Sequence, residues 1–437
     1  MICLPPQVNT AMSLLEAAGF EAFLVGGAVR DQLRGAGPGK DWDLATSAHP
    51  QEVEAVFAGY RVIRAGWKHG TVTVHVDGLP LEITTYRTGG AGPGRFSGRL
   101  EEDLAHRDFT MNAIAYRPGT GLVDPYGGRS DLDRGVIRCV GDPDRRFRED
   151  GLRLLRALRF AAVFGMRLAP DTADAVHRNR ELLRSVAPER MGAEWTSLLC
   201  GPQAACVLRI FADTAAVSIP ELAPLFHFDQ HNPHHDRDVW EHTLAVLSAA
   251  PPEPVLRWAA LLHDCGKPLC FSMGEDGTGH FYGHAAQSAR LADTVLARLC
   301  CDTSSRTRIT ALIRYHDTPI VPEPRPVCRL LNRLGPEGAR QLIALHRADT
   351  LGQSALCRDR LTQYRRAEAV LEALLREKAC FSRRDLAVRG GDLTALGLRG
   401  RAVGAGLQAC LEAVLDGRVP NQRDALLDFL RSGLPGG

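Results

Sequence analysis

The spacing of apolar residues changes once along this chain. In roughly the first 140 positions, helix-like and strand-like spacings alternate. Val8–Ala18 has helical spacing, and Thr71–Val76 alternates as a half-buried strand does. Asp77-Gly78 is typical of a hairpin turn, and Leu81–Tyr86 is predicted to be the returning strand. Helical spacing dominates thereafter. The pattern predicts an α+β protein: an α/β head with a small, mainly antiparallel sheet, followed by an all-helical remainder.

A strand, a turn and a helix are predicted in immediate succession near the start. Phe23–Val25 is apolar enough for a buried strand, Gly26 and Gly27 follow it, and Ala28–Leu33 is predicted to be helical. Glycine permits a tight turn, and the free N–H groups of a helix start can hold phosphate. The segment therefore predicts a phosphate-binding turn, although a glycine pair by itself is usually only a turn.

Two aspartates follow this segment. Asp41 and Asp43 are two residues apart, so on a strand they point to the same face. Paired carboxylates suit Mg²⁺, which also suits triphosphates. Glu82, on the returning strand, is either a third carboxylate of this site or an exposed edge charge. These residues predict metal-assisted transfer of a nucleotidyl group.

Charged residues recur in steps of three further along the chain. Asp150, Arg153, Arg156 and Arg159 would lie on roughly one face of a helix. A salt-bridged surface helix is one interpretation. In the other, Asp150 accepts from an exocyclic amino group and Arg153 donates to a ring nitrogen or carbonyl. Cytosine and adenine carry that amino group, so the pair could select C and A without a nucleic-acid template.

Composition narrows the class of protein. A chain of 437 residues with 45% hydrophobic content predicts about two to four packed domains. No apolar run reaches the ~20 residues that span a bilayer, and the first residues lack signal-peptide features, so we expect a cytoplasmic protein without membrane contact. The twelve cysteines contain no C-x-x-C zinc pattern and are expected to be reduced thiols.

Taken in order, six segments resemble the class II tRNA nucleotidyltransferases and bacterial poly(A) polymerases. The resemblance is greatest to the CCA-adding enzymes, which rebuild the 3′ end of tRNA from CTP and ATP. The segments that carry it are Leu24–Asp31, Asp41–Asp43, Glu82–Arg87, Arg107–Ala113, Asp124–Gly128 and Glu149–Phe160.

The resemblance implies a role for each matching residue. Asp41 and Asp43 would hold two Mg²⁺ ions, with Glu82 as a further catalytic carboxylate. Asp150 and Arg153 would read the base, and Arg156 and Arg159 would support them. The triphosphate would lie against the glycine turn and nearby arginines, namely Gly26, Gly27, Arg30 and Arg107. The implied partners are tRNA, CTP and ATP, and no protein partner can be inferred.

The resemblance also implies a division into domains and raises two alternatives. The expected domains are a head (1–140), a helical neck (141–205), a helical body (206–375) and a helical tail (376–437). His106 replaces a usual arginine, and the loop at 88–99 is short and glycine-rich. A shortened loop is typical of relatives that add only CC, so a CC-adding enzyme is an alternative, as is a poly(A) polymerase.

A second set of metal-ligand residues lies in the body. A single histidine on an apolar helix is usually a core residue, but the ordered set resembles the HD phosphohydrolases: His242, His263, Asp264, His284, His316 and Asp349. Such ligands suit Mn²⁺, Ni²⁺, Co²⁺ or Fe²⁺. The resemblance implies hydrolysis of phosphomonoesters or 2′,3′-cyclic phosphates by a metal-bound water. There are three alternatives: the metal only holds helices together, the site has decayed, or this hydrolysis is the main activity of the protein. His231, His234 and His235 are not expected to be ligands.

Overall fold

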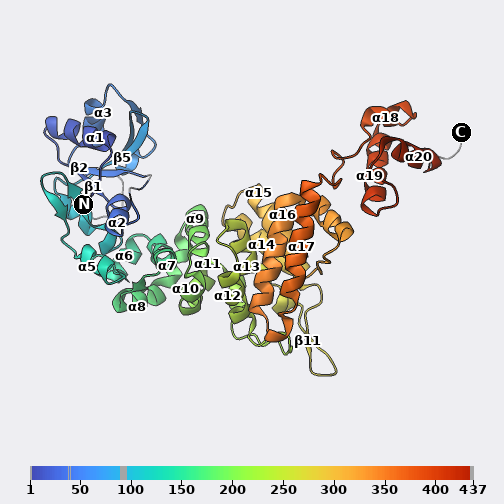
Figure 1. Ribbon diagram of the computed structural model, residues 1–437. Coiled ribbons are helices and arrows are strands. Elements are labelled where there is room, and N and C mark those ends of the chain that lie inside the picture. Colours follow the sequence, from blue (N-terminus) through green and yellow to red (C-terminus); the bar gives the residue numbers. More distant parts are fainter. Residues whose placement is uncertain (1, 38, 40, 89–95, 434–437) are drawn as a thin grey trace. The chain divides into compact units, whose positions relative to one another are not determined.

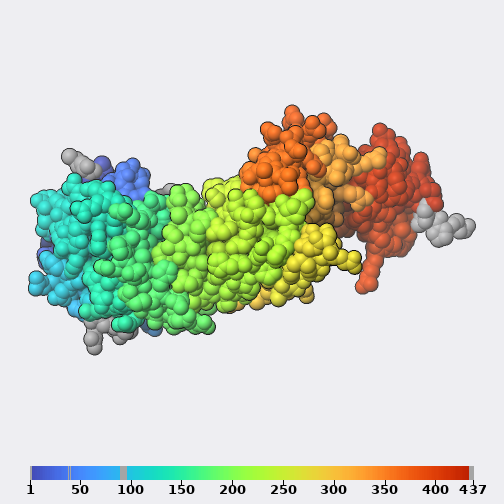
Figure 2. Space-filling view, turned by 90° about the horizontal axis from the view of Figure 1, so that it is seen from below, coloured from blue at the N-terminus to red at the C-terminus, as the bar shows by residue number. Residues whose placement is uncertain are grey.

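The computed structural model describes residues 2–37, 39, 41–88 and 96–433, and the remaining residues are grey in Figure 1 and Figure 2. The chain forms two compact units, Met1–Ser218 and Ile219–Gly437. Within the described residues, no helix is long and apolar enough to cross a membrane.

A seven-stranded sheet organises the first part of the first unit. Its strand order is β3-β4-β5-β2-β1-β6-β7. Every neighbouring pair is antiparallel except β2 and β5, so the prediction of a mainly antiparallel sheet is confirmed. The strands are β1 (Ala22–Val25), β2 (Asp43–Thr46), β3 (Arg61–Ile63), β4 (Thr71–Val76), β5 (Leu79–Thr85), β6 (Ala115–Arg117) and β7 (Gly121–Val123).

The two faces of the sheet pack against different helices. Alternating residues of the strands, such as Leu24 and Leu44, are buried with side chains of α1 (Pro6–Ala17) and α3 (Pro50–Val56). The opposite face, which includes Ala45, is buried with Leu104 of α4. Because side chains alternate along a strand, Asp43 lies on the same face as Ala45. That face carries the first candidate site.

Helices complete the first unit (Figure 1). They are α2 (Gly27–Leu33), α4 (Leu100–Ala105), α5 (Gly128–Asp133), α6 (Pro143–Glu149), α7 (Leu152–Phe164), α8 (Pro170–Asn179), α9 (Pro188–Leu199), α10 (Ala204–Ile210) and α11 (Ala212–Ser218). A short parallel pair, β8 (Val136–Ile137) and β9 (Arg167–Leu168), lies among them.

In the described residues of the second unit, 219–433, the regular elements are helices apart from one hairpin, β10 (Ser272–Met273) with β11 (Gly279–His280). Its long helix α16 bends at Gly335, whose φ of 69° lies outside the helical region. The last three helices bury a small core of their own around Leu393 and Leu426. The helices are α12 (Val239–Ala249), α13 (Pro254–Leu262), α14 (His284–Arg298), α15 (Thr303–Tyr315), α16 (Pro324–Gly352), α17 (Arg360–Arg376), α18 (Gly390–Ala395), α19 (Arg401–Leu415) and α20 (Arg423–Gly433).

Candidate active site and metal centre

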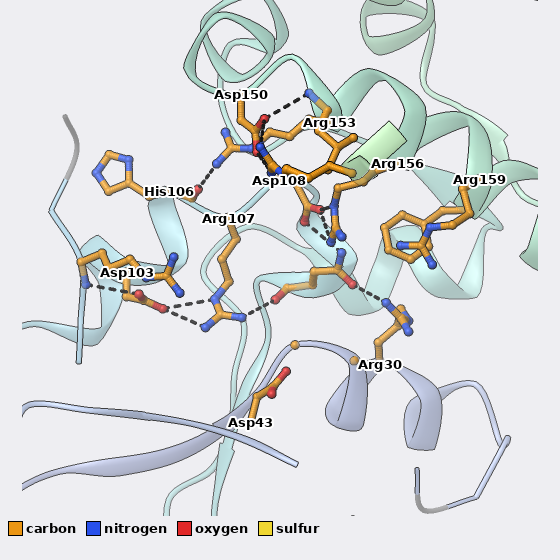
Figure 3. A pocket seen from close by; sticks show the side chains of 17 residues that line it. Arg30, Asp43, Asp103, His106, Arg107, Asp108, Asp150, Arg153, Arg156 and Arg159 are labelled. Carbon is orange, nitrogen blue, oxygen red and sulfur yellow. Dashed lines mark hydrogen bonds and ion pairs between the residues drawn. The ribbon is translucent and has the colours of Figure 1, made fainter. Parts of the chain in front are cut away.

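A cavity of about 410 Å³ opens on the α4 side of the sheet in the first unit (Figure 3). Its walls come from the turn after β1, the start of β2, the segment after α4, and α7. The predicted nucleotide-contacting residues all line it, together with Asp43: Gly26, Gly27, Arg30, Arg107, Asp150, Arg153, Arg156 and Arg159. Asp41 and Glu82 are not among its lining residues.

Carboxylates gather beside one end of the cavity. Asp43 is the first residue of β2 and is in register with Glu82 on β5. Burial raises the pKa of Asp43, and the neighbouring charges of Glu82 and Asp41 raise it further. Asp41 itself is exposed. This accumulation of negative charge is what a divalent cation would neutralise.

Two arginines flank the glycine turn. Arg30 donates to Asn112 Oδ1 at 2.7 Å, and Arg107 donates to Asp103 Oδ2 at 2.9 Å. Gly26 has φ of 69° and ψ of −133°, a conformation that favours glycine. A Cβ at Gly26 would lie 3.3 Å from Arg107 Nη1, so the bare backbone keeps this end of the cavity open.

The prediction that Asp150 shares a helix face with Arg153 is wrong. α6 ends at Glu149, Asp150 is extended (φ −153°, ψ 105°), and α7 begins at Leu152. The Asp150 carboxylate accepts a hydrogen bond from Leu152 N at 3.1 Å. A Cβ on Gly151 would lie 2.8 Å from the carbonyl oxygen of Leu182, so close packing selects glycine at the break between the helices.

The two halves of the predicted base-reading pair are held by different partners. Asp150 Oδ2 accepts from Arg190 Nη2 of α9 at 2.8 Å. Arg153 instead donates to the carbonyl oxygen of His106 at 2.8 Å and to Glu149 at 3.0 Å. The sequence analysis did not identify Arg190 as a residue of this site.

Arg156 is supported by the buried Asp108, as Figure 3 shows, and Arg159 by the partly buried Glu194. Arg156 Nε donates to Asp108 at 2.8 Å, and Arg159 Nε donates to Glu194 of α9 at 2.5 Å. Burial alone would raise the pKa of Asp108, but the charge of Arg156 and the hydrogen bonds from Asn112, Arg156 and the Phe109 backbone outweigh it and lower that pKa. The two arginines thus fix α7 to the head and to α9.

His106 lies at the rim of the cavity. Its Nδ1 is 3.3 Å from Arg146 Nη1. Arginine only donates, so Nδ1 is the acceptor and the imidazole is neutral. Burial, and then the charge of Arg146, lower the pKa of His106 accordingly. The predicted flexible loop at 88–99 falls mostly on positions 89–95, outside the described residues.

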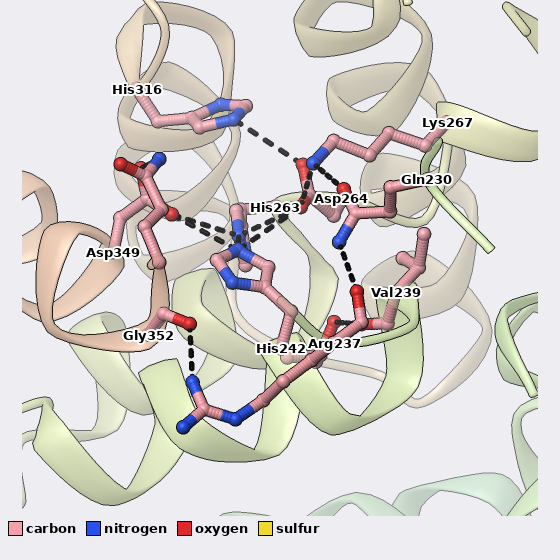
Figure 4. Close-up of polar contacts among 12 residues, drawn as sticks. Gln230, Arg237, Val239, His242, His263, Asp264, Lys267, His316, Asp349 and Gly352 are labelled. Atoms are coloured by element: carbon pink, nitrogen blue, oxygen red, sulfur yellow. Dashed lines mark hydrogen bonds and ion pairs between the residues drawn. The ribbon is translucent and has the colours of Figure 1, made fainter. Parts of the chain in front are cut away.

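The second unit brings all six predicted metal ligands together beside a cavity of about 280 Å³, and Figure 4 labels five of them: His242, His263, Asp264, His316 and Asp349. Two groups of ligand atoms share Asp264: one with His242 and His263, the other with His284 and His316. Asp349 completes the cluster, with Oδ1 3.0 Å from His242 Nε2.

Three of these histidines have a fixed ring orientation. His263, His284 and His316 each have Nδ1 within 2.7–2.9 Å of the carbonyl oxygen three residues earlier. Nδ1 therefore carries the proton, and the Nε2 lone pairs face one another, as in metal-bound imidazoles. Lys267 Nζ is 2.7 Å from Asp264 Oδ2, yet neither oxygen of this fully buried carboxylate accepts a hydrogen bond of normal geometry. The donor set fits one or two divalent transition metals.

His235, which the sequence analysis did not expect to be a ligand, also lines this cavity. Its ring is 5.0 Å from that of His242, edge to face, and its buried Nδ1 has no hydrogen-bond partner. Burial, and then the charge of Lys267, lower the pKa of His235 to about 3, so it is neutral at physiological pH.

Models of known families match four stretches of the chain. A poly A polymerase head domain covers residues 22–138, and a polymerase A RNA-binding model covers 165–225. An HD domain covers 239–354, and a tRNA nucleotidyltransferase domain 2 model covers 349–430.

Curated relatives and solved structures agree with these matches. A CCA-adding enzyme of Geobacillus thermodenitrificans is 46% identical over 264 residues, which are 58% of this chain and 61% of the relative. This relative and five other CCA-adding enzymes are matched over only 53–64% of their own length. A CCA-adding enzyme of Lactiplantibacillus plantarum is 31% identical over 98% of this chain and 97% of the relative.

One crystal structure is similar along nearly the whole chain. The Bacillus stearothermophilus CCA-adding enzyme in complex with CTP has a TM-score of 0.74, with 31% identity over 98% of both chains. With the full-length similarity to the Lactiplantibacillus plantarum protein, this likeness shows that the chain belongs to the family of CCA-adding enzymes.

Proposed function

We propose that this protein adds C and A to the 3′ end of tRNA from CTP and ATP, without a nucleic-acid template. The observation that carries the proposal is the single cavity that joins a carboxylate at the sheet, two arginines at the glycine turn, and the Asp150 and Arg153 side chains. Metal, triphosphate and base can therefore be held at once by one wall of side chains. Crystal structures of related proteins contain CTP or tRNA.

In this mechanism the 3′ hydroxyl of the tRNA attacks the α-phosphorus and pyrophosphate leaves. Asp41 and Asp43 would hold Mg²⁺, which lowers the pKa of the attacking hydroxyl and neutralises the leaving oxygens. Arg30 and Arg107 bind the triphosphate. Asp150 accepts from the amino group of cytosine or adenine, and Arg153 donates to the adjacent ring nitrogen.

The test is incorporation of labelled CTP and ATP into tRNA that ends before the first C, after it, or after CC. We expect C, C and A to be added in turn, and Asp43→Asn to abolish all three additions. Failure of the wild-type protein on all three substrates would overturn the proposal. Addition of C without A would favour a CC-adding enzyme, and long A tails from ATP alone would favour a poly(A) polymerase.

The metal centre of the second unit favours a second activity, hydrolysis of phosphomonoesters or 2′,3′-cyclic phosphates. Its support is the convergence of four buried histidines, three of them with a fixed imidazole tautomer, and two carboxylates beside a cavity. Mn²⁺, Ni²⁺, Co²⁺ or Fe²⁺ bound there would supply a water-derived nucleophile. Hydrolysis of p-nitrophenyl phosphate and of 2′,3′-cyclic AMP by the metal-loaded protein, with Asp264→Asn as the inactive control, tests it. Hydrolysis that Asp264→Asn leaves intact would exclude this site.

A further inference from the structure

Arg146 is a buried arginine to which the proposed mechanism gives no task. It lies on α6, its side chain is only 4% exposed, and it is not among the lining residues of the nucleotide cavity. Arginine is almost never fully buried unless it is paired. Its partners should therefore indicate what it does.

Those partners are the end of α4 and Glu149. Arg146 Nη1 donates to the carbonyl oxygen of Ala105, the last residue of α4, at 3.0 Å and lies beside the His106 ring. Arg146 Nη2 donates to Glu149 Oε1 at 2.6 Å. The last carbonyls of a helix lack partners within the helix and carry partial negative charge, so the guanidinium caps α4.

Arg153, the proposed base reader, is held by the same glutamate and by backbone carbonyls beside the end of α4. Its Nη2 donates to the carbonyl oxygen of His106 at 2.8 Å, and its Nη1 donates to Glu149 Oε2 at 3.0 Å and to the carbonyl oxygen of Arg146 at 3.1 Å. Glu149 thus binds the Arg146 and Arg153 guanidinium groups on different carboxylate oxygens, and the exposed Arg145 also donates to its Oε1, at 3.3 Å. Arg146, Arg153, Glu149 and the end of α4 form one connected set of contacts.

We propose that Arg146 is a positioning residue that fixes the Arg153 guanidinium for base selection. The inference rests on the proposed nucleotidyl transfer. An arginine side chain has several rotatable bonds, and Arg153 is held by Glu149, which Arg146 also binds, and by the backbone carbonyls of Arg146 and His106. Asp150 is held separately, by Arg190. Loss of the Arg146 side chain should therefore loosen Arg153, the hydrogen-bond donor to the base, and leave Asp150, the acceptor, in place.

The consequence falls on the choice between CTP and UTP. Cytosine presents a ring-nitrogen acceptor to Arg153, whereas uracil presents an N–H at that position. A guanidinium held in this position can donate a hydrogen bond to cytosine but not to uracil. Once it is loosened, the kcat/KM for CTP should fall more than that for UTP, by about tenfold or more, since a misplacement of about 1 Å can cost 100-fold.

The test compares Arg146→Met and Arg146→Lys with wild type on tRNA that ends before the first C. The ratio of kcat/KM for CTP to that for UTP is measured, with thermal unfolding in parallel. Arg146→Lys keeps the charge in case the methionine variant does not fold. The matched control is Arg148→Met, because Arg148 is an exposed arginine on the same helix.

We expect the CTP/UTP ratio to fall in both Arg146 variants and to stay unchanged in Arg148→Met. In an Arg153→Ala background, Arg146→Met should lower the ratio no further, since its effect passes through Arg153. A ratio that is unchanged while stability falls, or that falls equally in the Arg153→Ala background, would overturn the inference. Absence of CTP incorporation by the wild type would instead overturn the proposed function.

Discussion

At the residue scale, the first site depends on a few positions where the backbone or a neighbouring charge leaves little choice. Gly26 needs a conformation with positive φ, and its missing side chain leaves room beside Arg107. Asp108 is buried, and the charge of Arg156 and the hydrogen bonds from Asn112, Arg156 and the Phe109 backbone favour its ionised form. Each position makes a separate prediction.

Gly26→Ala should abolish most nucleotide incorporation. The backbone conformation strains any L side chain, and the new Cβ would lie 3.3 Å from Arg107 Nη1 and 3.6 Å from Asp43 Oδ2. We expect kcat/KM for CTP to fall by about 100-fold, the loss associated with small misplacements at a reacting centre. Steady-state incorporation kinetics measure it. Gly59→Ala, in open space in the same unit, is the control, and an active Gly26→Ala variant would contradict the argument.

Asp108→Asn should destabilise the first unit by about 2 kcal/mol at neutral pH, since a hydrogen bond between charged groups is lost. The pKa of Asp108 is lowered on folding. Its stabilisation is therefore complete above the unfolded value of about 3.9 and disappears as the pH falls through the lower folded value.

Calorimetric unfolding of wild type and Asp108→Asn from pH 3 to pH 8 checks this. The difference in unfolding free energy should be constant above about pH 5 and narrow below about pH 4. Asp133→Asn, at an exposed position, should show no such difference. If the difference in unfolding free energy between wild type and Asp108→Asn grew as the pH fell, the pKa of Asp108 would be raised on folding and the prediction would be wrong.

At the element scale, the break between α6 and α7 decides where the base-reading carboxylate lies. The periodicity of Asp150, Arg153 and Arg156 correctly indicated a helix for the two arginines. It failed at Asp150, because a three-residue step does not reveal a helix start. The break depends on the approach of the Leu182 backbone to Gly151, a contact between segments some thirty residues apart.

Gly151→Ala tests this close approach. The added Cβ would meet the Leu182 carbonyl oxygen at 2.8 Å and Val186 Cγ2 at 3.1 Å, so backbone must move. Overpacking of this kind costs about 1–3 kcal/mol. We expect a lower melting temperature of the first unit and, because Asp150 adjoins the strained position, a higher KM for CTP. A variant with wild-type stability and KM would refute the role of this packing.

At the scale of the whole molecule, the two candidate chemistries lie in separate units. The nucleotide cavity is built from residues within Met1–Ser218, and the metal centre from residues within Ile219–Gly437. The structure thus gives each site its own scaffold. The two should respond independently to substitution.

Ni²⁺ or Mn²⁺ should raise the unfolding temperature of the metal-free second unit, because a ligand that binds only the folded state stabilises it. Asp264→Asn, which alters the carboxylate shared by both ligand groups, should remove that shift and leave CTP incorporation unchanged. His227→Gln is the control, since the His227 side chain is 99% exposed. Differential scanning calorimetry with and without the metal checks it, and an equal shift in Asp264→Asn would place the metal elsewhere.

The sequence by itself determined the class of fold and the strand–turn–helix beside paired carboxylates. It also determined the two ordered sets of candidate residues, one for nucleotidyl transfer and one for metal binding. These features are local: alternation along a strand, glycines in a turn, and ligand residues within short motifs. It also assigned five arginines to the nucleotide site, and all five line one cavity: Arg30, Arg107, Arg153, Arg156 and Arg159.

Only the tertiary structure decided which partners hold those residues. The pairing of Asp150 with Arg190, the capping of α4 by Arg146, and the register of Asp43 with Glu82 join segments that are distant in sequence. Such contacts depend on how helices and strands pack, and periodicity along one element carries no information about a neighbouring element. The sequence therefore indicated which residues carry the chemistry, and packing determined how those residues are arranged.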